Sequence, residues 1–257
     1  MNLGLEGRRA LVCASSRGLG FACAEALARE GAEVWINGRD GAALAAAEAA
    51  LAELGTVHAV LADLNTEAGR AALLKACPEP DVLVTNNNGP APGTYAQWGE
   101  AEWEGAFLAN MIAPALLIRS VLDGMRARKF GRIVNITSAM VKSPHPNMGL
   151  STAARAALTA FSKGLSKEVA KDNVTINNLL PERFDTARQQ QMAKIAMEMR
   201  GLTLEQARAE MAATIAAGRL GQPSEFGDAC AFLCSAQAGY ISGQNLQLDG
   251  GSYQGLI

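Results

Sequence analysis

The stretch A-L-V-C-A-S-S-R-G-L-G, residues 10–20, constrains the fold of this chain more than any other. Its first three residues are apolar, which is typical of a strand buried on both faces. Gly18 and Gly20 tolerate a tight turn and the close approach of another surface. The helix predicted next begins with free backbone N–H groups and a partial positive charge, which suits the pyrophosphate of a dinucleotide. Alone, the motif also fits a strand-to-helix turn without a ligand. The residues of this turn expected at the dinucleotide are Ala14, Ser16, Arg17, Gly18, Leu19 and Gly20.

Length and composition predict one α/β domain over residues 1–257. The chain has 257 residues, of which 49% are hydrophobic and 19% charged, enough for one large core. A net charge of -2 gives no electrostatic reason to expect nucleic acid or an anionic membrane as a partner. No apolar run approaches the roughly 20 residues that span a bilayer, and no apolar signal core opens the chain. We therefore expect a cytoplasmic protein without a membrane partner.

The five cysteines predict neither a disulfide framework nor a metal site. Their number is odd, and no C-x-x-C spacing recurs. Cys230 and Cys234 lie four residues apart on a predicted helix, but His58 and His145 are both distant in the sequence. We expect buried thiols and no bound metal.

Seven short apolar segments alternate with helical ones along the chain. This order indicates a parallel sheet with helices on both faces, and right-handed crossovers make the sheet doubly wound. Ligands of such sheets bind beyond the carboxyl ends of the strands. The predicted strands span residues 8–13, 33–37, 58–61, 81–85, 131–137, 173–179 and 245–248. The predicted helices include residues 22–30, 42–54, 66–76, 97–130 and 151–170.

The end of the second predicted strand bears on the identity of the dinucleotide. An NAD enzyme commonly has an acidic residue here to hold the ribose 2′-hydroxyl, whereas this chain has Asn37. Arg39 follows two residues later and Arg17 lies in the first turn, so two guanidinium groups are available for a 2′-phosphate. We therefore predict NADP rather than NAD. The alternative is a solvated Arg39 beside an Asp40 that caps the next helix.

Polar residues also end the third and fourth predicted strands. Asp63, followed by Leu64, is expected within reach of the adenine of the cofactor. Three asparagines, residues 86–88, close the fourth strand although asparagine is disfavoured in strands. Their amides can tie loops together and leave backbone groups free for a ligand, so Asn87 and Asn88 are expected at the cofactor.

Two further polar residues are candidates for chemistry. The fifth predicted strand places Ser138 at its carboxyl end, and Asn110 lies at a buried level of the helix 97–130. The Met-rich segment 186–218 follows the sixth strand, where an insertion commonly forms a lid over the substrate. An ordinary peripheral helix pair is the alternative for this segment.

Together these motifs resemble the short-chain dehydrogenase/reductase family over nearly the whole chain, above all its 3-oxoacyl carrier-protein reductase-like branch. The resemblance rests on S-S-R-G-L-G, N-N-N-G, Asn110, N-I-T-S and the ending Y-I-S-G-Q-N-L-Q-L-D-G-G. It implies a Rossmann fold, a nicotinamide cofactor and commonly a homotetramer. The family's first turn glycine is Ala14 here, and its Pro-Gly after the sixth strand is Pro181-Glu182. Pro181 and Arg183 are expected at the cofactor, with Arg183 neutralising Glu182.

The catalytic set departs further from the resemblance. The family uses Asn, Ser, Tyr and Lys, and the positions of its Tyr and Lys, counted from Ser138, hold Ser151 and Arg155. A phenol has a pKa of about 10, which a nearby ammonium lowers until the group can protonate a carbonyl that receives hydride. An aliphatic hydroxyl is a much weaker acid, but Ser151 can donate a hydrogen bond or relay a proton through water, and Arg155 can bind ribose hydroxyls. Lys142 and His145 are alternative proton donors.

We therefore expect an NADP-dependent oxidoreductase that interconverts a carbonyl and a secondary alcohol of a small-molecule substrate. Ser138 would polarise the oxygen, Asn110 would hold a water or the backbone, and Arg155 would orient the ribose. Ser151 or Lys142 would take part in proton transfer. Two alternatives stay open on this fold: a nucleotide-binding sensor or regulatory subunit without redox turnover, and a lyase or isomerase.

Overall fold

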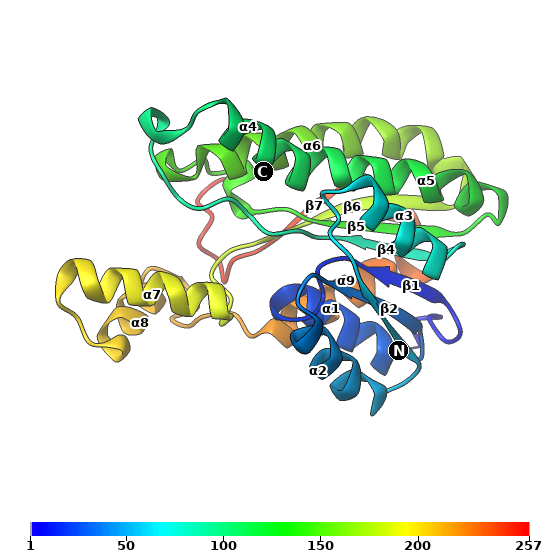
Figure 1. Cartoon of the computed structure of the whole chain (residues 1–257), viewed down its shortest axis with the longest axis horizontal. Helices are drawn as coiled ribbons and strands as arrows, with labels where there is room; N and C mark the ends of the chain where they lie inside the picture. The colour runs from blue at the N-terminus through cyan, green and yellow to red at the C-terminus, as the bar shows by residue number, and fades with distance from the viewer. Residues whose placement is uncertain (1, 257) are drawn as a thin grey trace.

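The computed structural model describes residues 2–256 and contains a sheet of seven parallel strands in the order β3-β2-β1-β4-β5-β6-β7 (Figure 1). Every predicted strand is present, with ends that agree within two residues, so the doubly wound parallel sheet is confirmed. The strands are β1 (Arg9–Val12), β2 (Glu33–Gly38), β3 (Val57–Leu61), β4 (Val82–Thr85), β5 (Gly131–Ile136), β6 (Val174–Pro181) and β7 (Asn245–Leu248).

Helices cover both faces of the sheet (Figure 1). The helices α1, α2 and α9 pack on one face, and α3, α5 and α6 pack on the other. Strand β1 shows the alternation that two covered faces require, because Ala10 and Val12 join the first core cluster and Leu11 joins the second. The helices are α1 (Gly18–Arg29), α2 (Gly41–Ala52), α3 (Glu67–Ala76), α4 (Glu100–Phe107), α5 (Ala113–Ala127), α6 (Gly149–Val169), α7 (Ala187–Arg200), α8 (Leu204–Ala213) and α9 (Pro223–Cys234).

The predicted helix 97–130 is divided. Helix α4 is followed by a π-helical segment, η2 (Leu108–Ile112), and then by α5. Such segments are rare and are frequent at functional sites. Asn110 lies within it, so the wider turn sets the direction of that side chain.

The same helical run corrects the expectation that no segment approaches membrane-spanning length. Residues Glu100–Ala127 form 28 helical residues with a mean hydropathy of 1.6 over an 18-residue window, long and apolar enough by length and composition alone. Half of that window is buried in the protein. Leu117 and Ile118 pack in the second core cluster, as expected of a core helix of a globular domain.

A polar network crosses the sheet beneath the site. Asn135 on β5 accepts a hydrogen bond from the Thr85 hydroxyl at 2.6 Å and donates to Ser162 Oγ at 2.9 Å and to Asn178 Oδ1 at 3.0 Å. Asn135 and Ser162 are completely buried. Because every polar atom of this amide has a partner, the network fixes the register of β4, β5 and β6 against α6.

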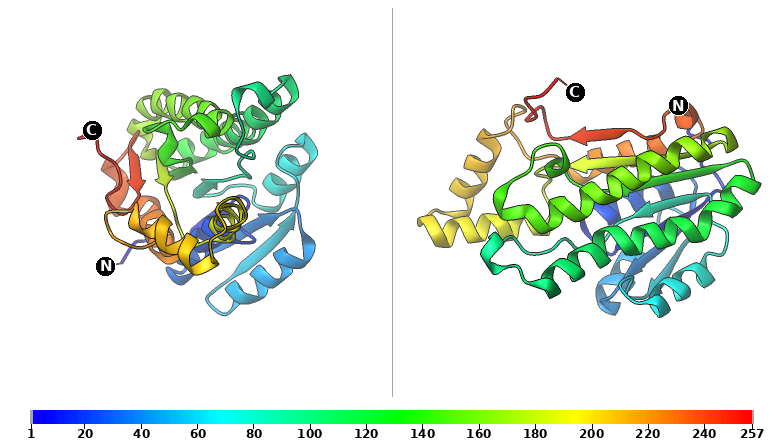
Figure 2. Two further views of the ribbon diagram at one scale, coloured as in Figure 1. Left: turned by 90° about the vertical axis from the view of Figure 1, so that its left-hand side faces the viewer. Right: turned by 90° about the horizontal axis from the view of Figure 1, so that it is seen from above.

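Helices α7 and α8 occupy the segment 186–218 and extend beyond the carboxyl ends of the strands (Figures 1 and 2). They pack against each other. Helix α8 begins with a capping box: the Gln206 backbone N–H donates to Thr203 Oγ1 at 3.2 Å, and the Thr203 N–H donates to Gln206 Oε1 at 2.8 Å. The five cysteines are all buried and free, as the sequence predicts.

Candidate functional site

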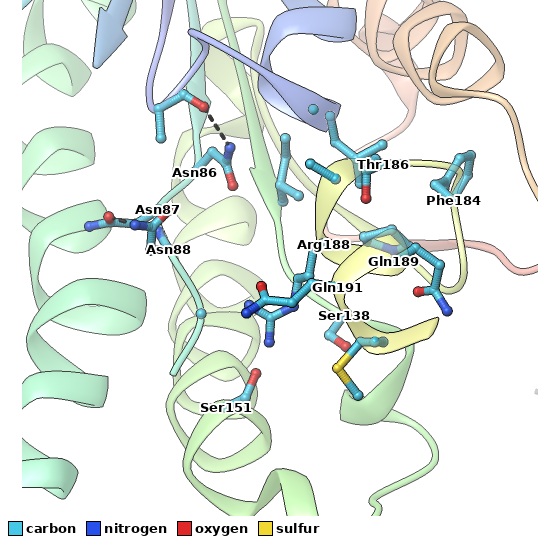
Figure 3. Close-up of a pocket in the computed structure, with 18 of the residues that line it drawn as sticks. Asn86, Asn87, Asn88, Ser138, Ser151, Phe184, Thr186, Arg188, Gln189 and Gln191 are labelled. Carbon is cyan, nitrogen blue, oxygen red and sulfur yellow. Dashed lines mark hydrogen bonds between the residues drawn. The ribbon is translucent and has the colours of Figure 1, made fainter. Parts of the chain in front are cut away.

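The strand order reverses between β1 and β4, and there the carboxyl ends of the strands open into a cleft of about 1380 Å³. The turn after β1, residues that follow the neighbouring strands, and one side of α7 and α8 form its walls (Figure 3). Of the candidate residues named from the sequence, all line this cleft except Gly20, Asn110 and Lys142.

The turn after β1 has the shape of an anion site. Ala14 has φ of 44° and Gly18 has φ of 63°, so Ala14 takes a left-handed conformation that costs a residue other than glycine about 1–2 kcal/mol. A Cβ on Gly20 would lie 2.4 Å from the Ala14 carbonyl oxygen, so only glycine lets α1 approach this turn. Arg17 is the N-cap residue of α1, and its side chain forms no capping hydrogen bond with the first turn of the helix. The N–H groups of the first turn are therefore available to a ligand.

Asn37 organises this turn from within. Its side chain is 1% exposed, donates to the carbonyl oxygens of Val60 at 3.1 Å and Ala62 at 3.0 Å, and accepts from the Ala14 N–H at 3.3 Å. Its amide thus connects the end of β2, where Asn37 lies, to the ends of β1 and β3. This contact set gives Asn37 a positioning role in the turn, and since Asn37 also lines the cleft, its contact with the cofactor stays a prediction.

The predicted phosphate-binding arginine lies at the cleft edge. Arg39 is 50% exposed, and its Nη1 lies 3.8 Å from Asp63 Oδ2, a distance at which the charges interact without a hydrogen bond. Asp40 accepts hydrogen bonds from the N–H groups of Ala42 and Ala43 at 3.1 and 3.2 Å, so it caps α2. The cap in our alternative interpretation is therefore present, while Arg39 still lines the cleft.

The asparagines after β4 tie neighbouring loops together. Asn86 donates to the Ala14 carbonyl oxygen at 3.1 Å, and Asn87 donates to the backbone of the π-helical segment at 3.2 Å. Asn110 is 5% exposed and donates to the Asn88 carbonyl oxygen at 3.3 Å. Asn110 does not border the main cleft but a second cavity of about 400 Å³ beside it. The side chains hold the loop that carries Asn88 along the cleft wall.

Two hydroxyls and a guanidinium also line the cleft. Ser138 follows β5 and accepts a hydrogen bond from the Met140 N–H at 3.2 Å. Ser151, near the start of α6 and 3% exposed, accepts a hydrogen bond from the Arg155 guanidinium one turn later. Arg155 Nε is buried without a partner. Burial, aided by the positive charge of Arg188, lowers the pKa of Arg155 to about 10, so this group stays charged at neutral pH.

Lys142 is not in the site, and this corrects its prediction as a proton donor. Its Nζ lies 5.3 Å from the centre of the Tyr253 ring, and it is absent from the described wall of the cleft. The reason is local: residues Ala139–Val141 form a short 3₁₀ turn after Ser138, which carries Lys142 towards the C-terminal segment. His145 does line the cleft, and its Nδ1 accepts from the Asn147 N–H at 3.3 Å.

The segment after β6 brings a carboxylate to the cleft. Glu182 Oε1 lies 3.6 Å from Arg183 Nε, as the sequence led us to expect. Burial raises the pKa of the Glu182 carboxyl, and the attraction of Arg183 offsets this only in part. Arg183 has a left-handed φ of 56°, so the strained position is Arg183 and not Glu182. Pro181, Glu182 and Arg183 all line the cleft.

Known proteins match this chain throughout. A family model described as enoyl-(acyl carrier protein) reductase matches residues 13–253. The 3-oxoacyl-[acyl-carrier-protein] reductase FabG of Vibrio cholerae is 32% identical over 256 residues, which covers 98% of this chain and 99% of the relative. Dehydrogenase/reductase SDR family member 4 of Bos taurus is 32% identical over 259 residues, covering 98% and 89%. The chain belongs to the short-chain dehydrogenase/reductase family. The crystal structure of L-sorbose reductase from Gluconobacter frateurii, complexed with NADPH and L-sorbose, superposes with a TM-score of 0.95 at 29% identity and full coverage of both chains.

Family membership confirms the resemblance drawn from the motifs and the Rossmann-type sheet. It does not by itself assign the side chains of this member. Sequence reasoning overlooked Arg188, which lies in the first turn of α7 and lines the cleft near Arg155 (Figure 3). The available signal was weak: no acidic residue follows Arg188 at three or four positions along the helix, where an ion-pair partner would lie.

Proposed function

We propose that this member of the short-chain dehydrogenase/reductase family is an NADP(H)-dependent oxidoreductase that interconverts a carbonyl and a secondary alcohol. The observation that carries the proposal is one cleft in which the glycine turn, Arg17 and Arg39 lie with Ser138 and Ser151. The reductases to which the chain is similar, including a structure that holds NADPH, support the same reaction class and cofactor.

The residues of the cleft fit a phosphorylated dinucleotide. The uncapped N-terminus of α1 suits the pyrophosphate, and the exposed guanidinium groups of Arg17 and Arg39 suit a 2′-phosphate. When bound, the cofactor supplies or accepts the hydride. We assign the adenine to the part of the cleft at Asp63 and Leu64, and the nicotinamide end to the part at Asn88 and the segment 181–183.

Proton handling in this proposal rests on Ser151 and Arg155, which stand in place of the family's Tyr and Lys. Because Arg155 donates to Ser151 Oγ, the hydroxyl hydrogen of Ser151 is free to point at a substrate oxygen. The fixed positive charge of Arg155 stabilises negative charge that develops on that oxygen. Ser138 donates a second hydrogen bond, and the proton reaches the product oxygen from solvent through Ser151. Asn110 keeps the Asn88 loop in place.

The test is NADPH oxidation, followed by absorbance, with ketone, quinone and 3-oxoacyl thioester panels. We expect turnover with at least one panel, and Ser138→Ala should lower kcat by about 10²–10³ with an unchanged Kd for NADPH. Ser143→Ala, an exposed serine of the same loop, is the matched control and should retain the parent rate. Tight NADPH binding without oxidation in any panel would favour the non-redox alternative, and no binding of either dinucleotide would refute the cofactor assignment.

We also propose that the protein is a single cytoplasmic domain that assembles as a homotetramer. The helical run Glu100–Ala127 and α6 would pair the subunits. Three large apolar side chains on these helices are exposed, Trp103 at 38%, Ile112 at 41% and Phe161 at 37%, which supports a covered face in an assembly. Light scattering should give four times the chain mass; a monomer at micromolar concentration would contradict this assignment.

The segment 186–218 is proposed as the substrate lid. Its helices line the cleft, and the bidentate pair between Arg208 and Asp185, at 3.0 and 2.6 Å, ties α8 to the segment after β6. NADPH together with substrate should slow proteolysis within 186–218. Equal cleavage rates with and without both ligands would speak for an ordinary peripheral helix pair.

A further inference from the structure

Two arginines from different helices meet at one point of the cleft. Arg155 extends from α6 and Arg188 from the first turn of α7. A Cβ placed on Gly89 would lie 3.3 Å from both terminal nitrogens of Arg155 and 3.4 Å from Nη1 of Arg188. The two guanidinium groups therefore lie together on one side of the Gly89 backbone. Arg188, Ser138 and Ser151 are seen in the same cavity (Figure 3).

Neither arginine has an acidic partner among residues 2–256. Arg155 donates to Ser151 Oγ and keeps a buried Nε without a partner. Arg188 donates to the carbonyl oxygen of Pro90 at 3.3 Å. Most donor groups of the two side chains are thus unused, although a guanidinium offers five N–H donors.

Of the four other arginines that line the cleft, three lie beside a carboxylate, and the fourth, Arg17, is an exposed residue that we assign to the 2′-phosphate. Those pairs are Arg39 with Asp63 at 3.8 Å, Arg183 with Glu182 at 3.6 Å and Arg200 with Glu210 at 2.6 Å. The chain therefore neutralises these positive charges and leaves the Arg155–Arg188 pair to repel each other. Their repulsion contributes to the lowered pKa of Arg155, and an anion between them would relieve it.

We propose that the Arg155–Arg188 pair binds a carboxylate of the substrate, so that the protein acts on short oxo acids with a free carboxylate close to the reacting carbonyl. The proposal rests on the proposed function and names its substrate class. In the reaction, the carbonyl carbon gains the hydride, its oxygen gains a proton, and the carboxylate is unchanged. A carrier-protein thioester has no free carboxylate next to its carbonyl, so this substrate class differs from that named for the FabG relative.

The position of the pair supports an anion on the substrate. Ser151 Oγ accepts a hydrogen bond from Arg155, so a group held by the two arginines lies next to the hydroxyl that we assign to proton relay. Planar guanidinium groups match a carboxylate through paired hydrogen bonds. A carboxylate so held would fix the distance from the carbonyl to Ser151, and this makes the pair a determinant of specificity.

The kinetic test compares each acid with its methyl ester: acetoacetate with methyl acetoacetate, and 2-oxobutanoate with methyl 2-oxobutanoate. We expect the parent protein to prefer the acid by about 10- to 100-fold in kcat/KM, the range of a charge-assisted pair. Arg188→Gln should remove most of this preference and leave the Kd of NADPH unchanged, and Arg188→Lys should restore part of it. Lys194→Gln is the matched control, because it removes the same charge from the same helix at an exposed residue that is not among those lining the cleft.

A second measurement needs no turnover: calorimetric binding of 2-oxobutanoate to the protein saturated with NADPH. Loss of this binding in Arg188→Gln but not in Lys194→Gln supports the anion site. Equal use of acids and esters by the parent protein overturns the proposal. A tenfold weaker NADPH affinity in Arg188→Gln would also overturn it, since the pair would then hold a cofactor phosphate.

The two proposals fail in different ways. Reduction of neutral ketones without binding of 2-oxobutanoate would reject the anion site and keep the oxidoreductase. Binding of 2-oxobutanoate through Arg188 without NADPH oxidation on any carbonyl would keep the anion site and reject the oxidoreductase.

Discussion

Arg39→Ala is the sharpest test of the cofactor assignment when both dinucleotides are measured. A charge-assisted hydrogen bond contributes about 1.5–3 kcal/mol. Arg39 is 50% exposed and shares its charge with Asp63 at 3.8 Å, so the gain from a 2′-phosphate is reduced by solvent screening and competition. We therefore expect a loss of about 1–2 kcal/mol for NADPH, which is a roughly 5- to 30-fold higher Kd. NADH has no 2′-phosphate, and its Kd should change less than about 2-fold.

The assay is titration of NADPH and NADH fluorescence at low and at high salt. The NADPH effect should shrink at high salt because exposed charges are screened. Arg29→Ala is the control, since Arg29 is 47% exposed, pairs with Asp228 at 3.5 Å and is not among the residues that line the cleft. Equal losses of NADPH and NADH affinity in Arg39→Ala would refute the 2′-phosphate argument. Tighter binding of NADH than NADPH by the parent protein would refute it as well.

Three further predictions concern the scaffold. Asn135→Leu removes three buried hydrogen bonds and should lower the free energy of unfolding in urea by about 2–4 kcal/mol; a loss under about 1 kcal/mol would show that the network is not structural. Glu182→Gln should stabilise the protein near neutral pH but not in acid. Because the pKa of Glu182 is raised in the folded state, the folded parent protein binds this proton more tightly than the unfolded chain, and its stability falls as the pH rises above the ordinary carboxyl range. Parallel curves of stability against pH for the parent and the variant would contradict this. Gly20→Ala should abolish NADPH binding or folding, because its Cβ would lie 2.4 Å from the Ala14 carbonyl oxygen, whereas Gly41→Ala, with nothing within 4 Å, should retain both.

The sheet could be predicted because strands buried on both faces are continuous apolar runs. Local chemistry explains why the helix predicted over residues 66–76 begins where it does: Thr66 caps α3 by accepting a hydrogen bond from the Gly69 N–H at 3.0 Å. The sequence predicts that α1 begins at residue 22, whereas the helix begins at Gly18. Glycines are poor helix formers, and the sequence does not show that packing holds the first turn.

Features that depend on distant partners escaped prediction. Arg132 is 1% exposed, a rare position for a charged residue, and donates to the carbonyl oxygens of Ser235 and Asn173 at 2.9 Å. Asn135 lies inside a strand, where local propensity disfavours it. In both cases the partners come from elements far away in the sequence. The prediction for Lys142 was wrong for a local reason: its spacing from Ser138 is suitable, but the 3₁₀ turn between them directs its side chain away from the cleft.

Ser151 and Arg155, which we propose stand in place of the family's Tyr and Lys, form one structural unit. Their spacing of four residues on α6 places the Arg155 guanidinium on Ser151 Oγ, so each side chain determines the setting of the other. Serine does not ionise in the range where a phenol can be tuned, and a guanidinium does not release its proton at neutral pH. In this proposal the unit therefore keeps the positive charge that the family's Lys carries, but it lacks an acid of adjustable pKa beside the reacting oxygen. A fixed positive charge favours substrates that carry their own negative charge, and Arg188 strengthens this preference from the facing helix. We therefore propose that a serine in place of the phenol and the second guanidinium of Arg188 together favour electrostatic binding of an anion over tuned proton donation.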